Sequence, residues 1–258
     1  TSKNPSINEY NRVIKSVRPL GSTFKIIPYA SALLEGIKLT DKFEDLPRCW
    51  ESYCPKNFSE HYRGSISLIE SFKSSSNIVP ISITKKIGLK NIINLANSFG
   101  LGYKQKLEEF PSLAIGSYGD NLLNITNAYS AINNNGKFQS PEILEKIESL
   151  NDKTIWENKF ISKKILDLKI NKKINKLLEK SVKEGTSKAA AIKGKRIYGK
   201  TGTSDGNKDL WFIGSIDNLT TGIWIGYDDN KESELSSGNA AYLWKKFIAE
   251  IYEIPIKK

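Results

Sequence analysis

Apolar residues in the N-terminal part of the chain recur with the spacing of a helix. Between residues 22 and 34, one face of the predicted helix carries apolar side chains, namely Phe24, Ile27, Ala30 and Leu34. Gly36 follows and is a typical helix stop. Pro28 lies inside the pattern, and its ring predicts a bend or a tightened turn there. The residues before the helix, 1–20, have the composition of a loop.

Similar periodicity predicts further helices beyond a loop at about 44–62 that is rich in Trp, Tyr and Pro. Their ranges are about 66–75, 79–87, 89–99, 120–135 and 170–184. Glycines mark the ends of the last three, at Gly100, Gly136 and Gly185. The 170–184 segment is Lys-rich, which is typical of a solvated helix face.

The pattern changes in the C-terminal third of the chain. Three segments, 196–202, 209–215 and 220–227, are rich in β-branched and aromatic residues and are separated by turn signals. They predict three consecutive antiparallel strands, and residues 240–252 predict a closing helix. Helices followed by strands indicate an α+β fold with an antiparallel sheet packed by helices, so we expect one mixed domain over 1–258.

Composition and charge narrow the class of protein. The 258 residues are 39% hydrophobic and 10% aromatic, which fits a globular domain. The net charge is +11, but the lysines are spread along the chain. This charge favours solubility and weak attraction to anionic polymers or membranes. No zinc-finger, basic-zipper or RNA-binding pattern occurs, so we expect no nucleic-acid partner.

The sequence predicts neither a membrane span nor a leader. No run of about 18 apolar residues occurs, and the polar start at Thr1 does not resemble a secretory signal. We therefore expect a mature piece or fragment of a longer protein.

Two cysteines, Cys49 and Cys54, lie close together. They are either two free thiols or one local disulfide, since the spacing permits a bridge without requiring it. With His61 as the single histidine they do not complete a metal site, and we expect neither metal nor cofactor. A serine hydrolase built on this chain needs a base other than histidine, unless His61 itself serves.

The first motif that carries chemistry is Ser22-Thr-Phe-Lys25. On a helix, residues three apart share a face, so the Lys25 amine is expected beside the Ser22 hydroxyl. If Ser22 opens the helix, its N–H is free to stabilise an oxyanion. A buried lysine near other cations loses its proton more easily and can act as the base.

Two further motifs follow in order along the chain. Ser75-Ser-Asn77 lies at a predicted helix end, and Lys200-Thr-Gly-Thr203 lies on the first predicted strand of the C-terminal sheet. Gly202 lets a substrate backbone lie close to that strand. The Thr201 and Thr203 hydroxyls, together with Lys200, suit a carboxylate.

Each motif alone is weak. Ser-x-x-Lys also occurs at Ser82 to Lys85, and Ser-x-Asn also occurs at Ser6-Ile-Asn8 and Ser237-Gly-Asn239. A lone serine of this kind is more often an N-cap or a surface residue. Lys-Thr-Gly occurs once, however, and the three motifs appear in the order known from β-lactamases and penicillin-binding proteins.

The chain thus resembles, over nearly its whole length, the transpeptidase domain of class A (bifunctional) penicillin-binding proteins. Other family-like runs are Glu9-Tyr-Asn-Arg12, Pro55-Lys-Asn-Phe58, Ser112-Leu-Ala-Ile-Gly116, Ala128-Tyr-Ser-Ala-Ile-Asn133, Glu184-Gly-Thr186, Asp209-Leu-Trp-Phe-Ile-Gly214 and Gly222-Ile-Trp-Ile-Gly226. The resemblance implies the β-lactamase/D,D-transpeptidase-like fold. The tryptophans of the two strand runs favour class A over class B enzymes.

The resemblance implies a role for each motif residue. Ser22 attacks the penultimate D-alanine carbonyl of a peptidoglycan stem peptide, and Lys25 takes its proton. The N–H groups of Ser22 and Thr203 form the oxyanion hole. Ser75, linked to Lys25 and Lys200, returns the proton to the leaving D-alanine.

The remaining motif residues are implied to bind substrate. Asn77 holds the substrate amide, while Thr201, Gly202 and Thr203 line the site of the terminal carboxylate. An amine of a neighbouring stem peptide resolves the acyl-enzyme, and β-lactams trap Ser22. The implied location is the periplasmic face of the inner membrane.

The chain also departs from the family pattern. Two strands normally precede Tyr10, and residues 1–9 do not supply them, so we expect an N-terminally truncated sheet with 222–227 as an open edge strand. We likewise expect the glycosyltransferase domain and the membrane anchor of the family to lie outside this chain. The Lys-, Ile- and Asn-rich usage suggests an AT-rich genome, such as that of a marine cyanobacterium.

Two alternatives remain open at this point. One is a serine β-lactamase or β-lactam sensor on the same fold, which would differ in the fate of the acyl-enzyme. The other is a catalytically inactive peptidoglycan-binding fragment, against which the three intact motifs argue. The persistence of a penicillin label on Ser22 separates these readings.

Overall fold

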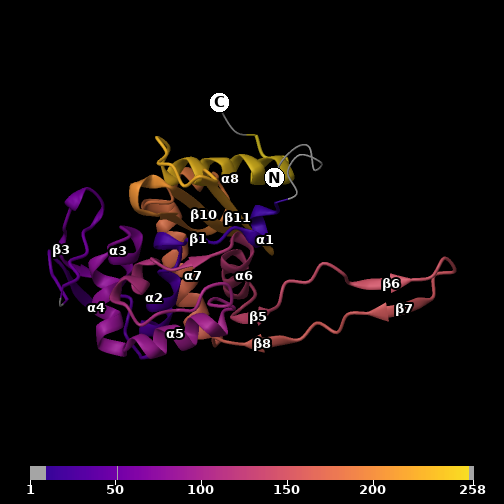
Figure 1. Ribbon diagram of the computed structural model, residues 1–258, viewed down its shortest axis with the longest axis horizontal. Coiled ribbons are helices and arrows are strands. Elements are labelled where there is room, and N and C mark those ends of the chain that lie inside the picture. Colours follow the sequence, from indigo (N-terminus) through magenta and orange to yellow (C-terminus); the bar gives the residue numbers. More distant parts are fainter. Residues whose placement is uncertain (1–9, 51, 256–258) are drawn as a thin grey trace.

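The computed structural model describes residues 10–50 and 52–255 (Figure 1). Its α-helices are α1 (Arg12–Lys15), α2 (Ile26–Leu34), α3 (Leu68–Lys73), α4 (Ile78–Ile87), α5 (Leu89–Ser98), α6 (Leu122–Asn133), α7 (Leu168–Glu184) and α8 (Ser237–Ile251). Its strands are β1 (Arg18–Pro19), β2 (Lys42–Asp45), β3 (Gly64–Ser67), β4 (Gly119–Asp120), β5 (Lys137–Gln139), β6 (Lys146–Glu148), β7 (Thr154–Glu157), β8 (Ser162–Lys164), β9 (Ile197–Thr203), β10 (Asp209–Ile216) and β11 (Leu219–Gly226).

The central sheet confirms the three predicted C-terminal strands. They are antiparallel in the order β11-β10-β9, and Trp211 of β10 pairs with Gly202 of β9 and with Trp224 of β11. Helix α8 covers one face, and α6 and α7 lie on the other side (Figure 1). All eight residues of β10 are buried because helices cover both of its faces. Within the described residues, β11 and β9 form the sheet edges, and the predicted loss of two strands stays a prediction.

Helix α2 forms the centre of the helical layer, and eight of its nine residues are buried. It contacts α4, α5 and α7, so apolar side chains are buried all round it. Pro28 is tolerated because it lies in the first turn, where the backbone N–H has no intrahelical partner. Leu34, on the predicted apolar face, is 45% exposed, because it is the last residue of α2 and emerges from the core.

Most predicted helices lie within a few residues of their expected positions. Segments 79–87, 89–99, 120–135, 170–184 and 240–252 correspond to α4, α5, α6, α7 and α8. The helix predicted at 66–75 is shorter, because residues up to Ser67 pair with β2 as strand β3. That pairing also places a strand at the start of the predicted 44–62 loop. The expected 1–20 loop contains α1 and β1, and residues 1–9 lie outside the described part.

An arm projects from the helical layer (Figure 1). The sequence pattern predicts no element between residues 137 and 169, yet four short strands lie there, paired as β5-β8 and β6-β7. Every residue of β6 and β7 is exposed. Large apolar side chains on the arm are exposed too, namely Ile143, Leu144, Ile147, Leu150, Ile155, Trp156, Phe160 and Ile161.

The loop between β2 and β3 is closed by a disulfide between Cys49 and Cys54. Of the two states that the sequence left open, free thiols or a local disulfide, the structure has the disulfide. Trp50 and Tyr53 pair through two backbone hydrogen bonds inside the ring. In the described part of the chain, no helix is long and apolar enough to cross a membrane. No group of three His, Cys, Asp or Glu side chains there could hold a metal ion.

Candidate active site

Ser22 lies in a 3₁₀ helix, Gly21–Thr23, that leads through Lys25 into α2. The expectation that Ser22 opens an α-helix is therefore wrong. The expectation that the Ser22 and Lys25 side chains lie on one face still holds, because side chains three residues apart are eclipsed in a 3₁₀ helix. Ser22 and Lys25 thus share a face, and the Ser22 side chain is half-buried.

The backbone of this turn leaves one amide group available. The hydrogen bonds that form the turn run from Thr23 N to Leu20 O and from Phe24 N to Gly21 O, at 3.4 and 3.0 Å. Among the described residues, the N–H of Ser22 donates to no backbone carbonyl. Such an N–H at a helix start suits a developing negative charge.

Three glycines let the turn pack directly on neighbouring backbone. Gly21 has a positive φ of 51°, and a Cβ there would lie 2.4 Å from Thr203 O. A Cβ on Gly116 would lie 2.0 Å from Gly21 O, and one on Gly202 would lie 2.7 Å from Leu20 O. These close approaches hold the Ser22 turn against the end of β9, so the turn and Thr203 are adjacent.

The Lys25 side chain is fully buried. Its Nζ donates hydrogen bonds to Ser75 O at 2.7 Å, Ser75 Oγ at 3.3 Å and Asn77 Oδ1 at 2.6 Å. Burial and the nearby charge of Lys200 hold the pKa of the Lys25 amine well below its ordinary value, while the charge of Asp45 acts in the opposite direction. The first motif is thereby joined to the second.

Within the described residues, none of the hydrogen bonds of Lys25 reaches the Ser22 hydroxyl. The two shortest ones go to the Ser75 carbonyl and to Asn77. A neutral amine keeps two N–H donors and one lone pair, so it can make both of these bonds and still accept a proton.

Ser75 stands between α3 and α4 with a left-handed backbone, φ 58°. Its Oγ lies 3.3 Å from Lys25 Nζ and 2.9 Å from Lys200 Nζ. The predicted placement of this motif at a helix end is confirmed. The hydroxyl can therefore pass a proton between the two amines.

Lys200 on β9 is also fully buried. Its Nζ donates to Thr201 O at 3.1 Å and to Thr186 Oγ1 at 3.4 Å, in addition to Ser75. Burial lowers the pKa of its amine to about 7. The site thus holds two buried lysines within hydrogen-bond reach of one serine hydroxyl.

The predicted substrate-binding residues surround this group. The Oδ1 of Asn77 accepts the bond from Lys25, and its Nδ2 donates to Lys56 O at 2.7 Å. Thr201 is 3% exposed and donates to Thr186 Oγ1 at 2.9 Å. Thr203 is half-buried at the end of β9. The structure therefore brings all predicted site residues into one region.

The competing Ser-x-x-Lys motif, Ser82 to Lys85, is located within α4. The Ser82 hydroxyl donates to Ile78 O at 3.2 Å, and Lys85 is exposed. This lysine therefore lacks the buried environment of Lys25. The buried surroundings of the lysine and the order of the motifs both favour Ser22 over Ser82 as the candidate nucleophile.

Three residues of the site received no role from the sequence. Thr186 contacts both Lys200 and Thr201. Asn57 binds the backbone of Asn77, and the buried Asp45 binds Asn57. Thr186 and Asn57 belong to the family-like runs noted above, which was the available signal. Nothing in the local pattern around Asp45 marked it.

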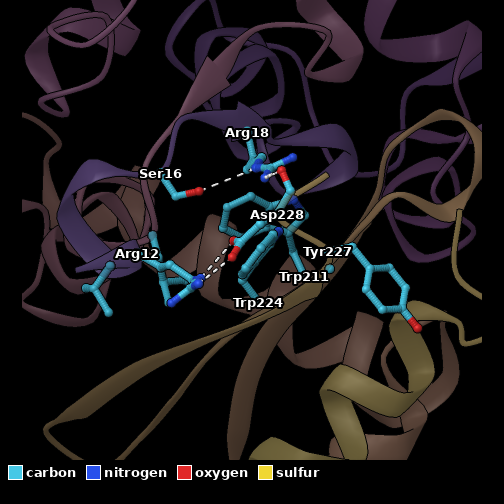
Figure 2. A pocket seen from close by; sticks show the side chains of 10 residues that line it. Arg12, Ser16, Arg18, Trp211, Trp224, Tyr227 and Asp228 are labelled. Carbon is cyan, nitrogen blue, oxygen red and sulfur yellow. Dashed lines mark hydrogen bonds and ion pairs between the residues drawn. The ribbon is translucent and has the colours of Figure 1, made fainter. Parts of the chain in front are cut away.

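A separate cavity of about 560 Å³ lies beside the end of β11 (Figure 2). Its lining includes Trp211 and Trp224 but none of the motif residues. Its polar groups bind one another: the Arg12 guanidinium pairs with the Asp228 carboxylate, and Arg18 donates to Asp228 O at 3.1 Å. We assign no chemistry to this cavity.

A Ser-x-x-Lys turn, a Ser-x-Asn turn and a Lys-Thr-Gly strand around two buried amines define the site of a serine acyltransferase. The family model for the penicillin binding protein transpeptidase domain matches residues 1–243, and the chain belongs to this family.

Curated relatives agree with this assignment. Penicillin-binding protein 1A of Rickettsia prowazekii is 31% identical over 256 residues, which cover 88% of this chain and 32% of the relative. Penicillin-binding protein 4 of Bacillus subtilis is 27% identical, covering 97% of this chain and 41% of the relative. The chain therefore spans about a third of the length of the Rickettsia protein.

Solved structures confirm the predicted fold class. Penicillin-binding protein 1A from Haemophilus influenzae has a TM-score of 0.88 at 23% identity, covering 99% of this chain and 45% of that one. Penicillin-binding protein A from M. tuberculosis, solved as an imipenem acyl-enzyme complex, has a TM-score of 0.81 at 21% identity. It covers 95% of this chain and 63% of that one.

Proposed function

We propose that this chain acts as a peptidoglycan D,D-transpeptidase that cross-links stem peptides through an acyl-enzyme on Ser22. The observation that carries the proposal is the Ser75 hydroxyl between the buried amines of Lys25 and Lys200, beside the Ser22 turn. Membership of the transpeptidase family supports it.

In the first half-reaction, Ser22 Oγ attacks the carbonyl of the penultimate D-alanine, and neutral Lys25 takes the hydroxyl proton. The N–H groups of Ser22 and Thr203 stabilise the oxyanion. The bond to the terminal D-alanine then breaks. Ser75 delivers a proton to the leaving amine and is reprotonated by Lys25, so protons balance.

In the second half-reaction, an amine from a neighbouring stem peptide attacks the ester on Ser22 and restores the free hydroxyl. Water in place of that amine gives D,D-carboxypeptidase activity. Asn77 holds the substrate amide. Lys200, with the Thr201 and Thr203 hydroxyls and the open backbone at Gly202, receives the terminal carboxylate. The polymer substrate places the reaction on the periplasmic side of the inner membrane.

The test is labelling with a fluorescent penicillin, followed by mass mapping of the modified peptide. We expect a single adduct on Ser22 that persists for many minutes. Ser22→Ala should abolish it, whereas the matched control Ser82→Ala should label like wild type. Rapid loss of the label with turnover would favour a β-lactamase, and absence of any label would favour an inactive binding fragment.

A further inference from the structure

Asp45 is a fully buried carboxylate at the end of β2, outside the three motifs. It accepts hydrogen bonds from Ser76 Oγ at 2.6 Å, Asn57 Nδ2 at 2.8 Å and Arg63 N at 3.2 Å. A buried carboxylate is costly unless such donors satisfy it. The groups that donate these hydrogen bonds therefore indicate the role of the Asp45 carboxylate.

The hydroxyl of Ser76 connects Asp45 to the start of α4. While it donates to Asp45, it accepts from Ile78 N at 3.1 Å and Val79 N at 3.2 Å. This is the capping contact of a helix start, where a negative charge is also favoured. Asp45 thus fixes the middle residue of the Ser75–Asn77 turn.

The amide of Asn57 connects Asp45 to the end of the same turn. A carboxylate only accepts hydrogen bonds, so the Asn57 amide must present its Nδ2 to Asp45 and its Oδ1 to the other side. That Oδ1 accepts from Asn77 N at 2.7 Å. Asn77 in turn accepts the bond from Lys25. The orientation of one amide therefore links Asp45 to the base.

We propose that Asp45 and Asn57 are positioning residues of the transpeptidase site. Together they fix the Ser75–Asn77 turn so that Lys25 is held between Ser75 and Asn77. This inference rests on the proposed function. The disulfide between Cys49 and Cys54 closes the segment that connects the two residues.

The primary variant is Asp45→Asn, which keeps the size of the side chain and removes its charge. One carboxylate oxygen of Asp45 accepts from both Asn57 Nδ2 and Ser76 Oγ, and the other accepts from Arg63 N. An amide offers only one acceptor oxygen, so its NH2 group must face one of these donors and the network that fixes the turn is loosened. We expect the acylation rate constant for a fluorescent penicillin to fall by about 10²-fold, because small displacements of catalytic groups have effects of this size. The apparent Kd of the penicillin should change by less than about twofold.

A second readout separates positioning from general structural support. The charged groups that act on the Lys25 amine are Lys200 and Asp45. Removal of the Asp45 charge should lower the pKa of Lys25 further, so the acid limb of the acylation profile should move to lower pH. A purely structural defect would leave the position of that limb unchanged.

The matched control is Asp41→Asn, an exposed carboxylate just before β2 that binds Lys38 N at 2.9 Å. It should acylate like wild type. If Asp45→Asn fails to fold, Asn57→Ala tests the connection from Asp45 through Asn57 to Asn77. This variant should also slow acylation by at least about tenfold, with the Kd of the penicillin unchanged.

Wild-type acylation rates in Asp45→Asn and Asn57→Ala would overturn the inference, as would losses that appear only in Kd. A wild-type chain that does not label at Ser22 would instead overturn the proposed function, and the inference with it.

Discussion

The Ser22 turn and the projecting arm differ in how they are held. The turn contacts the backbone of β9 and the loop around Gly116 at distances that leave no room for a Cβ. The α2 helix that continues it is buried at eight of nine positions. In the arm, by contrast, every residue of β6 and β7 is exposed.

The arm contains side chains as apolar as those of the core. Ile143 and Leu150 are fully exposed there, whereas Ile26 and Leu33 of α2 are 1% exposed. Apolar residues stabilise only where other elements cover them, and a two-stranded ribbon alone is marginal in water. The comparison indicates that precise chemistry is built where three elements meet, and not where apolar residues are merely frequent.

The largest effect is expected from Gly21→Ala in the turn. The new Cβ would meet Thr203 O, and the positive φ would add strain, for a combined loss of about 3 kcal/mol of unfolding free energy. Acylation by penicillin should fall by at least about 100-fold. Chemical denaturation and stopped-flow labelling measure the two quantities.

The control is Gly36→Ala at the end of α2. Gly36 also has a positive φ, 85°, but a Cβ there meets nothing within 4 Å. It should cost about 1 kcal/mol and leave acylation unchanged. Equal loss of acylation in both variants would mean that close packing at Gly21 is not what matters.

The second effect concerns pH. Acylation needs neutral Lys25, so its rate should fall about tenfold per pH unit below the lowered pKa of that amine. Lys200, with a pKa of about 7, should lose its charge as pH rises through that value, which weakens carboxylate binding. We expect a bell-shaped dependence of kcat/KM on pH. The two apparent pKa values of this profile describe Lys25 and Lys200 as a coupled pair. A rate that climbs unchanged to pH 10 would contradict the burial of both amines.

A smaller effect is expected from Tyr129→Phe on α6. The Tyr129 hydroxyl donates to Thr23 O at 2.8 Å, inside the core. Its removal leaves that carbonyl without this donor and should cost about 1–3 kcal/mol. Tyr242→Phe on the exposed face of α8 serves as the control and should leave the melting temperature unchanged. If the two variants melt alike, the turn does not depend on α6.

The smallest effect is expected from shortening the arm. Replacing residues 142–160 with a short Gly-rich turn keeps β5 paired with β8 and removes only the outer ribbon. We expect a change in unfolding free energy below about 0.5 kcal/mol and normal penicillin labelling. A large loss of stability would mean that the arm supports the core after all.

Much of the fold was predictable because local signals and burial agree. The Gly100, Gly136 and Gly185 stops mark three helix ends to within a few residues. The strands β9, β10 and β11 were found from β-branched and aromatic content. The arm gives no comparable signal, since strands of three or four residues that are exposed on both faces leave no periodic pattern.

The sequence predicts which residues form the candidate site better than it predicts how they are arranged. Motif order identified Ser22, Lys25 and Ser75, but the 3₁₀ conformation of the Ser22 turn depends on contacts of Gly21 with a strand about 180 residues later. Asp45 carries no local signal, because its role depends on a fold that brings it to the Ser75–Asn77 turn. The cyanobacterial origin stays a prediction.

The left-handed backbone of Ser75 has a consequence for any effort to improve this domain. A serine in that conformation is less stable than glycine by about 1 kcal/mol, and asparagine also tolerates it well. A library screened only for heat resistance should therefore enrich glycine or asparagine at position 75 and discard the hydroxyl between the two amines. A library screened for penicillin capture should retain the serine.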